Sequence, residues 1–285
     1  MNTDHSREID AGSRFEFGRN WRQFLGNVDE QRIQLATQSL QQLLGRDVAG
    51  ARFLDVGSGS GLFSLAARRL GATVLSFDFD PESVACTSEL RRLHQPNDPQ
   101  WSVERGSALD RNYLATLGRW DVVYSWGVLH HTGNMWAALQ ELPSLVADDG
   151  TLALALYNDQ GRSSKMWLQT KQLYNRLPRQ LRWLVMLPAV TRLWGPTLVR
   201  DLFKGSPLHT WQCYARESVR GMSPWYDLVD WVGGLPFEVA KPEQLLDFYR
   251  SLGFELTKLK TCAGGIGCNE YVFRRRAVLE TSSVG

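Results

Sequence analysis

Short apolar runs alternate with amphipathic segments from about residue 52 onward, apart from one long break. Seven runs have the length and composition of strands, at residues 52–56, 73–77, 101–105, 121–125, 151–157, 254–260 and 269–275. Segments with apolar positions at helical spacing separate them, at residues 62–70, 81–93, 135–146 and 241–253. The run LALAL is apolar at every position, which is typical of a sheet buried on both faces. The alternation therefore predicts an α/β fold with a doubly wound, seven-stranded, largely parallel sheet.

The same pattern divides the chain into four parts. Residues 1–50 combine a loose tail with a helical cap over residues 29–44, and residues 51–157 form the core with the first five strands. The alternation stops in residues 158–240, a Trp- and Arg-rich and mostly helical insertion, and residues 241–285 complete the sheet and end in a tail. Loops around a rigid sheet usually set specificity, so we expect the insertion to be a lid or substrate-binding region.

Composition and charge exclude few classes of partner or function. A formal net charge of +2 does not favour nucleic acid as a partner, although the arginines of the insertion leave that alternative open. The polar, acidic N-terminus lacks the basic start and apolar core of a signal peptide. The four cysteines match no zinc spacing and are too few for a disulfide scaffold. We therefore expect a cytoplasmic protein with reduced thiols and no metal.

The strongest chemical signal is LDVGSGSGLF, residues 54–63, where a strand runs into a helix. Gly57, Gly59 and Gly61 allow positive φ angles and a close approach of the backbone to a ligand. Amides at the start of the helix and the carboxyl ends of the strands then create a ligand crevice. An NAD-dependent oxidoreductase is disfavoured, because its G-x-G-x-x-G pattern needs a small residue where this chain has Leu62.

The pattern D-x-G-x-G-x-G, which begins at Asp55, resembles the first motif of the class I, Rossmann-like S-adenosylmethionine-dependent methyltransferases. Asp78 ends the second strand about 20 residues on, where a carboxylate accepts ribose hydroxyls. The resemblance runs from about Phe53 to Tyr157, and it is nearest to bacterial members with a large insertion after the fifth strand. It implies that S-adenosyl-L-methionine (SAM) is the cofactor and S-adenosyl-L-homocysteine (SAH) the product.

The resemblance also implies a set of cofactor contacts. It places Phe79 against the adenosine and Trp126 close to the cofactor. Many members carry an aspartate where this chain has Ser107, so a hydroxyl or a backbone amide would have to make that contact here. The expected cofactor site consists of Asp55, Gly57, Ser58, Gly59, Gly61, Asp78, Phe79, Ser107, Ala108 and Trp126.

His130 and His131 directly follow the fourth strand, on the ligand side of the expected sheet. Methyl transfer from a sulfonium needs a base only when the acceptor loses a proton of high pKa. Histidine suits that role, and we expect His131 to be the base before His130; the alternative is that one ring caps the next helix or holds the loop. Tyr157, after the fifth strand, is a third candidate, as a hydrogen-bond donor to the acceptor or as part of a polar turn.

The aromatic residues of the insertion have two interpretations. Trp211, Trp225 and Trp231 could line an acceptor pocket, but for most of them a place in the insertion's own core is the simpler interpretation. Residues 181–194, flanked by arginines, could make a peripheral contact with a membrane surface, but we favour an ordinary packed lid helix. Residues 17–24, FGRNWRQF, either close over the cofactor or pack on the core.

These features predict an SAM-dependent methyltransferase that modifies oxygen or nitrogen of a small-molecule, glycan or natural-product acceptor. Two alternatives stay open. An RNA methyltransferase would carry basic residues clustered around the mouth of the crevice. A non-catalytic SAM-binding protein would tolerate loss of both histidines.

Overall fold

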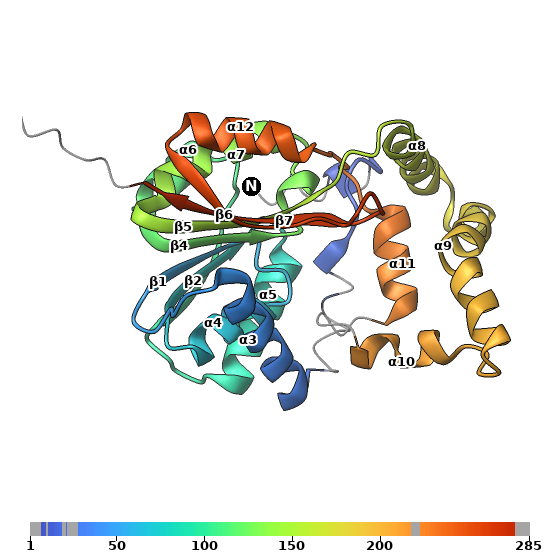
Figure 1. The fold of residues 1–285 in the computed structure, drawn as a ribbon, viewed down its shortest axis with the longest axis horizontal. Helices are drawn as coiled ribbons and strands as arrows, with labels where there is room; N and C mark the ends of the chain where they lie inside the picture. Colours follow the sequence, from blue (N-terminus) through green and yellow to red (C-terminus); the bar gives the residue numbers. More distant parts are fainter. Residues whose placement is uncertain (1–6, 10, 19–20, 22–27, 218–222, 277–285) are drawn as a thin grey trace, which may run out of the picture.

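A seven-stranded sheet lies between two layers of helices, with a further group of helices beyond one end of the strands (Figure 1). The computed structural model describes residues 7–9, 11–18, 21, 28–217 and 223–276. The strand order is β3-β2-β1-β4-β5-β7-β6. This arrangement confirms the predicted α/β class with a Rossmann-like, doubly wound sheet.

Six of the strands run parallel, and one runs against them. The strands are β1 (Arg52–Val56), β2 (Thr73–Asp78), β3 (Trp101–Arg105), β4 (Trp120–Trp126), β5 (Val146–Tyr157), β6 (Phe254–Lys260) and β7 (Cys268–Arg275). Strands β1 to β5 pair in parallel, and β7 is antiparallel to both β5 and β6. The direction of winding reverses between β1 and β4, so the connections there diverge and leave a crevice at the carboxyl ends of these strands.

Helices cover both faces of the sheet because alternate strand residues point to opposite sides. On one face lie α3 (Glu30–Leu44), α4 (Leu62–Arg69) and α5 (Pro81–His94); on the other lie α6 (Arg111–Thr116), α7 (Met135–Leu145) and α12 (Pro242–Ser251) (Figure 1). Phe53 packs into the first of these two cores and its neighbour Leu54 into the second. The expected N-terminal cap is α3, whose buried face joins the first core.

The sequence pattern predicts a strand over residues 151–157, but β5 already begins at Val146 and includes residues 147–150. Asp149 nevertheless has a positive φ of 58°, and the register of β5 against β4 shifts between Trp120 and Val122. Residues 147–150 therefore form an irregular start of the strand.

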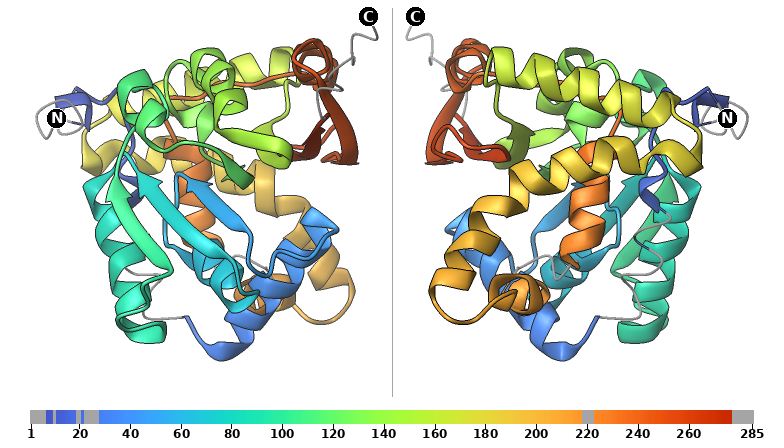
Figure 2. Two further views of the ribbon diagram at one scale, coloured as in Figure 1. Left: turned by 90° about the vertical axis from the view of Figure 1, so that its left-hand side faces the viewer. Right: turned by 90° about the vertical axis from the view of Figure 1, so that its right-hand side faces the viewer.

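The insertion forms a separate group of helices beyond the carboxyl ends of the strands (Figures 1 and 2). It comprises α8 (Arg162–Arg176), the short 3₁₀ helix η2 (Arg179–Leu181), α9 (Trp183–Phe203), α10 (His209–Glu217) and α11 (Pro224–Gly233). Helices α8, α9 and α11 share a small core of their own around Trp167, Val185 and Val232. Helix α9 contains Pro188 and Pro196. In the part of the chain that the structure describes, no helix is long and apolar enough to cross a membrane.

Substitution in the glycine turn after β1 tests whether the positive φ angle and the lack of space there require glycine. Gly57 has φ +83°, and a Cβ there would overlap the Val128 side chain, whereas the exposed Gly118 has φ +68° with open space around it. We expect Gly118→Ala to lower the free energy of unfolding by about 1–2 kcal/mol through left-handed strain alone. Gly57→Ala should lower it by about 2–4 kcal/mol, because overpacking adds to the strain. Urea unfolding measures both values. Equal losses would contradict the steric contribution at Gly57. Val128→Ala should relieve that contribution only in part, because the Val128 Cβ would remain 2.8 Å from the added Cβ.

Candidate active site

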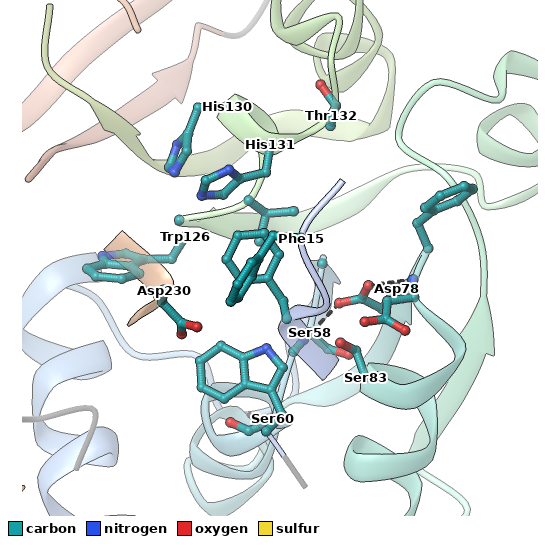
Figure 3. A pocket seen from close by; sticks show the side chains of 18 of the residues that line it. Phe15, Ser58, Ser60, Asp78, Ser83, Trp126, His130, His131, Thr132 and Asp230 are labelled. Atoms are coloured by element: carbon teal, nitrogen blue, oxygen red, sulfur yellow. Dashed lines mark hydrogen bonds between the residues drawn. The ribbon is translucent and has the colours of Figure 1, made fainter. Parts of the chain in front are cut away.

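A cavity of about 660 Å³ lies at the carboxyl ends of β1, β2, β4 and β5, with the insertion forming its far wall. All three expected catalytic residues and all the expected cofactor residues except Gly61 line it. In Figure 3, Asp78 lies beside Ser58 and Ser83 at one side of the pocket, Trp126 and Asp230 lie at the other, and the two histidines lie next to each other. The topology thus gathers residues that are far apart in the sequence.

The three glycines of the turn have different reasons to be glycine. All three have positive φ: 83° at Gly57, 55° at Gly59 and 80° at Gly61. Gly59 faces the cavity, where the nearest atoms to an added Cβ belong to Trp21 at 3.3 Å. Gly61 precedes α4 and faces α5 instead, since an added Cβ would come within 2.9 Å of Thr87. Glycine at this position therefore allows α4 and α5 to pack closely.

Asp78 is the acceptor around which the first half of the cavity is organised. Its two carboxylate oxygens accept hydrogen bonds from the amides of Gly59, at 2.9 Å, and Asp80, at 3.0 Å. Burial raises the pKa of Asp78 to about 6, although these amide donors oppose the shift. At neutral pH the group is therefore mainly ionised, and it can accept further hydrogen bonds from a ligand.

Asp55 is buried at the base of the turn, and one oxygen is held by a chain of side chains. Ser64 donates to Asp55 Oδ2 at 2.5 Å, Ser76 donates to Ser64 at 2.7 Å, and the Trp101 indole donates to Ser76 at 2.9 Å. This chain joins β1, β2, β3 and α4. Burial raises the pKa of Asp55 to about 7. Asp55 therefore connects β1 to α4, the elements on either side of the turn, and also lines the cavity.

The two histidines differ in which ring nitrogen carries the proton. His131 Nδ1 lies 2.6 Å from the carbonyl oxygen of Pro236, and a carbonyl can only accept, so Nδ1 donates. His130 Nδ1 instead accepts from the Tyr157 amide at 3.4 Å. In the neutral rings the lone pair is therefore on Nε2 of His131, whereas Nε2 of His130 carries the proton. Only His131 is in the tautomer in which Nε2 can take up a proton.

The rings around the histidines fix their orientation. His130 is fully buried, and its ring packs face to face, with a tilt of 33°, on the Tyr157 ring at 3.8 Å between centroids. The Phe17 ring lies 4.6 Å from that of His131. Tyr157 in turn contacts Trp231 of α11, at 5.2 Å between centroids. The three expected catalytic residues thus form one aromatic cluster, in which His130 has a packing role and His131 closes one side of the cavity.

The N-terminal segment, residues 14–18, lies across the cavity. Arg14 donates to the carbonyl of His131 at 3.1 Å and lies over the Phe79 ring at 5.1 Å. The Gly18 amide donates to Asp80 at 2.9 Å. This segment therefore connects the two halves of the cavity. The part of the sequence motif FGRNWRQF at residues 19–20 and 22–24 lies outside the described residues.

The insertion supplies the far wall of the cavity. Its contributions come from α9, α10 and α11, namely Leu193, Trp194, Tyr214, Asp227, Leu228, Asp230 and Trp231. Tyr214 donates to Asp227 at 2.5 Å. Of the tryptophans considered from the sequence, Trp231 lines the cavity, Trp211 packs behind Trp194 at 4.6 Å, and Trp225 is exposed. Glu270 of β7 pairs with Lys260 outside the cavity.

Lys171 of α8 supports this wall and has no sequence signal that distinguishes it from a surface lysine. It is fully buried, and its ammonium donates to the carbonyl of Trp231 and lies 4.7 Å from the rings of Trp231 and Phe237. Burial lowers the pKa of Lys171 to about 7, although the charge of Asp230 opposes the shift. The buried Lys171 side chain therefore connects α8 to α11, and removal of its charge from water opposes this contact.

Comparison with known proteins identifies the family. A family model described as a methyltransferase domain matches residues 28–194, which is more than half of the chain, so the chain belongs to this family. The ubiquinone biosynthesis O-methyltransferase of Xanthomonas campestris pv. campestris (strain B100) is 35% identical over 109 residues, 38% of this chain and 44% of that protein. The chain thus spans less than half the length of the curated relatives it matches. The family expected from the glycine motif is confirmed.

Solved structures show the same fold at low sequence identity. Magnesium protoporphyrin IX methyltransferase from Synechocystis PCC 6803, solved with bound SAH, aligns with a TM-score of 0.52 at 16% identity, over 95% of this chain and all of that chain. The [4+2]-cyclase SpnF aligns with a TM-score of 0.51 at 13% identity, over 85% of this chain and 80% of that chain. Proteins with different named activities share this fold, so the reaction must be argued from the site.

The buried lysine predicts a particular pH dependence of stability. The unfolded state keeps Lys171 protonated up to about pH 10.5, whereas the folded state releases that proton near pH 7. Rising pH between these values therefore favours the folded state, by about 1.4 kcal/mol per pH unit. We expect this gain to be absent in Lys171→Met and present in Lys165→Met, a change at an exposed site of the same helix. Urea unfolding at pH 7.5 and 9.5 measures it, and parallel behaviour of both variants would contradict the assignment.

Proposed function

We propose that the protein is an SAM-dependent methyltransferase that transfers a methyl group to oxygen or nitrogen of a small-molecule, glycan or natural-product acceptor. One observation carries the proposal: Asp78, the positive-φ glycine turn and the His131 ring face one cavity at the point where the sheet reverses its winding. The name of the Xanthomonas relative, an O-methyltransferase, supports oxygen as the methylated atom.

The residues at the first side of the cavity fit the proposed cofactor. Asp78 presents an ionised carboxylate for two ribose hydroxyls, and the backbone of Gly57, Ser58 and Gly59 can approach the ligand closely. Phe79 offers a ring to the adenosine. Asp55, Ser107, Ala108 and Trp126 complete the proposed site, and Gly61 contributes through helix packing. When bound, SAM supplies an electrophilic methyl group on a sulfonium.

The second side of the cavity fits proton removal and the exclusion of water. His131 Nε2 is suited to accept a proton from an acceptor hydroxyl or amine. The Pro236 carbonyl holds the ring through Nδ1 and stabilises the positive charge that the ring then gains. Tyr157, Trp126 and Trp231 provide apolar walls, and the phenol of Tyr157 can also donate to the acceptor. His130 holds Tyr157 in place.

The insertion is proposed as the substrate-binding region over residues 158–240, because α9, α10 and α11 close the cavity opposite the sheet. The charged residues that line the cavity argue against RNA as the acceptor. Among the described lining residues Arg14 is the only lysine or arginine, whereas six are carboxylic acids: Glu8, Asp55, Asp78, Asp80, Asp227 and Asp230. A polyanion would meet repulsion in such a cavity.

Calorimetric titration tests the proposed cofactor site. We expect micromolar binding of SAM and SAH and no binding of NAD. Asp78→Asn should weaken SAH binding roughly 10- to 150-fold, because hydrogen bonds to a charged group contribute about 1.5–3 kcal/mol. Since the pKa of Asp78 is about 6, SAH affinity should fall as the pH is lowered from 7.5 to 5.

The matched variant separates Asp78 from the other groups that titrate in this range. Asp55, with a pKa of about 7, is retained in Asp78→Asn, so any pH dependence that remains in this variant belongs to other groups. The pH dependence that the substitution removes is the part assigned to Asp78. Binding of NAD alone would overturn the proposed function, and unchanged SAH affinity in the variant would remove Asp78 from the site.

The proposed base is tested by turnover after acceptors have been screened with a labelled methyl donor. His131→Gln keeps a polar side chain of similar size but cannot accept a proton at neutral pH. We expect it to lower kcat by about 10²–10⁴-fold, the usual contribution of a general base. SAH affinity should stay within about twofold of the parent value. A normal rate in His131→Gln would assign the residue a structural role, and a protein that binds SAM but methylates no acceptor would favour the non-catalytic alternative.

A further inference from the structure

Helix α9 exposes large apolar side chains in its first and last turns. These residues, here called the apolar face, are Trp183, Leu184, Leu187, Val199, Leu202 and Phe203. Phe203 is 87% exposed, Leu202 64% and Leu187 61%. Single exposed apolar residues are normal on a protein surface, but a concentration along one helix marks an interaction site.

Other side chains of α9 are buried in the insertion or line the cavity. Val185, Met186 and Ala189 are buried in the core of the insertion. One turn further along, Leu193 and Trp194 line the active-site cavity. In Figure 2, α8 and α9 form the outer layer over this end of the molecule. The apolar face therefore lies on the outside, while the inner side of the same helix forms a wall of the cavity.

The charge around the apolar face has one sign. Residues 160–212 contain nine lysines and arginines and a single acid, Asp201, in a chain whose total net charge is only +2. Asp201 is buried, where it accepts hydrogen bonds from the amide and hydroxyl of Thr210. The exposed cations of this stretch include Arg176 at the end of α8, Arg179 just before α9, and Arg192, Arg200 and Lys204 in or directly after α9.

We propose that the apolar face binds the surface of an anionic lipid bilayer, with α9 lying in the interface. Exposed Trp, Phe and Leu bordered by Lys and Arg are the combination that interfacial helices use, since apolar side chains enter the lipid and cations meet anionic headgroups. A second copy of the chain would bring two surfaces of the same charge together. A nucleic acid would engage the cations but leave the leucines exposed to water.

Vesicle flotation of the full chain tests this proposal. We expect the protein to float with vesicles of mixed phosphatidylglycerol and phosphatidylcholine at low salt. Binding to pure phosphatidylcholine, or to the mixed vesicles in high salt, should be much weaker, because the attraction to anionic lipid is screened. The double variant Leu187→Ser/Phe203→Ser should lower the partition coefficient at least about tenfold. The control Leu93→Ser, at an exposed leucine of α5 outside the apolar face, should leave it unchanged.

Three further measurements distinguish the possible causes of a negative result. SAH titration of each variant checks that the cofactor side of the cavity is intact, and circular dichroism checks folding independently of the proposed function. Sedimentation velocity without vesicles detects self-association. Failure of the folded parent protein to float with anionic vesicles would overturn the proposal. So would a dimer that Leu187→Ser/Phe203→Ser dissociates, since the face would then be an interface between copies.

Discussion

The carboxylate of Asp78 is the point on which the cavity depends. It accepts amides from two segments that share no strand: Gly59, in the turn after β1, and Asp80, at the start of α5. Asp80 in turn accepts the amide of Gly18, so the N-terminal segment is attached to the same point. One side chain thus sets the relative position of the glycine turn, the edge of α5 and the segment across the cavity. Burial raises the pKa of Asp78, because a carboxylate is more stable in water than in this cavity. The hydrogen bonds from the two amides oppose this effect.

The regular part of the fold could be predicted from the sequence because it is encoded locally. Each strand and helix of the core has its own periodicity, and positive φ at Gly57 and Gly59 follows from a motif a few residues long. For the same reason the gathering of Asp78 and the two histidines in one cavity could be predicted, since the carboxyl ends of parallel strands meet at one edge. The start of β5, predicted at residue 151, was wrong, since the strand begins at Val146. Residues of the kind found at 147–150 usually form turns, and Asp149 has the positive φ of a turn residue although it lies inside a strand.

The supports of the site could not be predicted, because they join residues that are distant in the sequence. The Pro236 carbonyl fixes the tautomer of His131 across 105 residues, and Lys171 reaches the Trp231 carbonyl across 60. Nothing in the sequence around Pro236 marks its carbonyl as a partner of a histidine. The inner and outer sides of α9 likewise depend on packing against α8 and α11, which a helical period alone does not supply.

The two prolines of α9 bear on how deeply that helix can sit in a bilayer. Proline has no amide hydrogen, so Pro188 and Pro196 cannot donate to the carbonyls of Leu184 and Arg192 four residues earlier. A backbone carbonyl without its helical donor is strongly disfavoured in hydrocarbon but is readily hydrated among headgroups. The backbone of α9 therefore limits its own depth: side chains such as Phe203 can reach into the acyl region while the helix axis stays at the hydrated boundary.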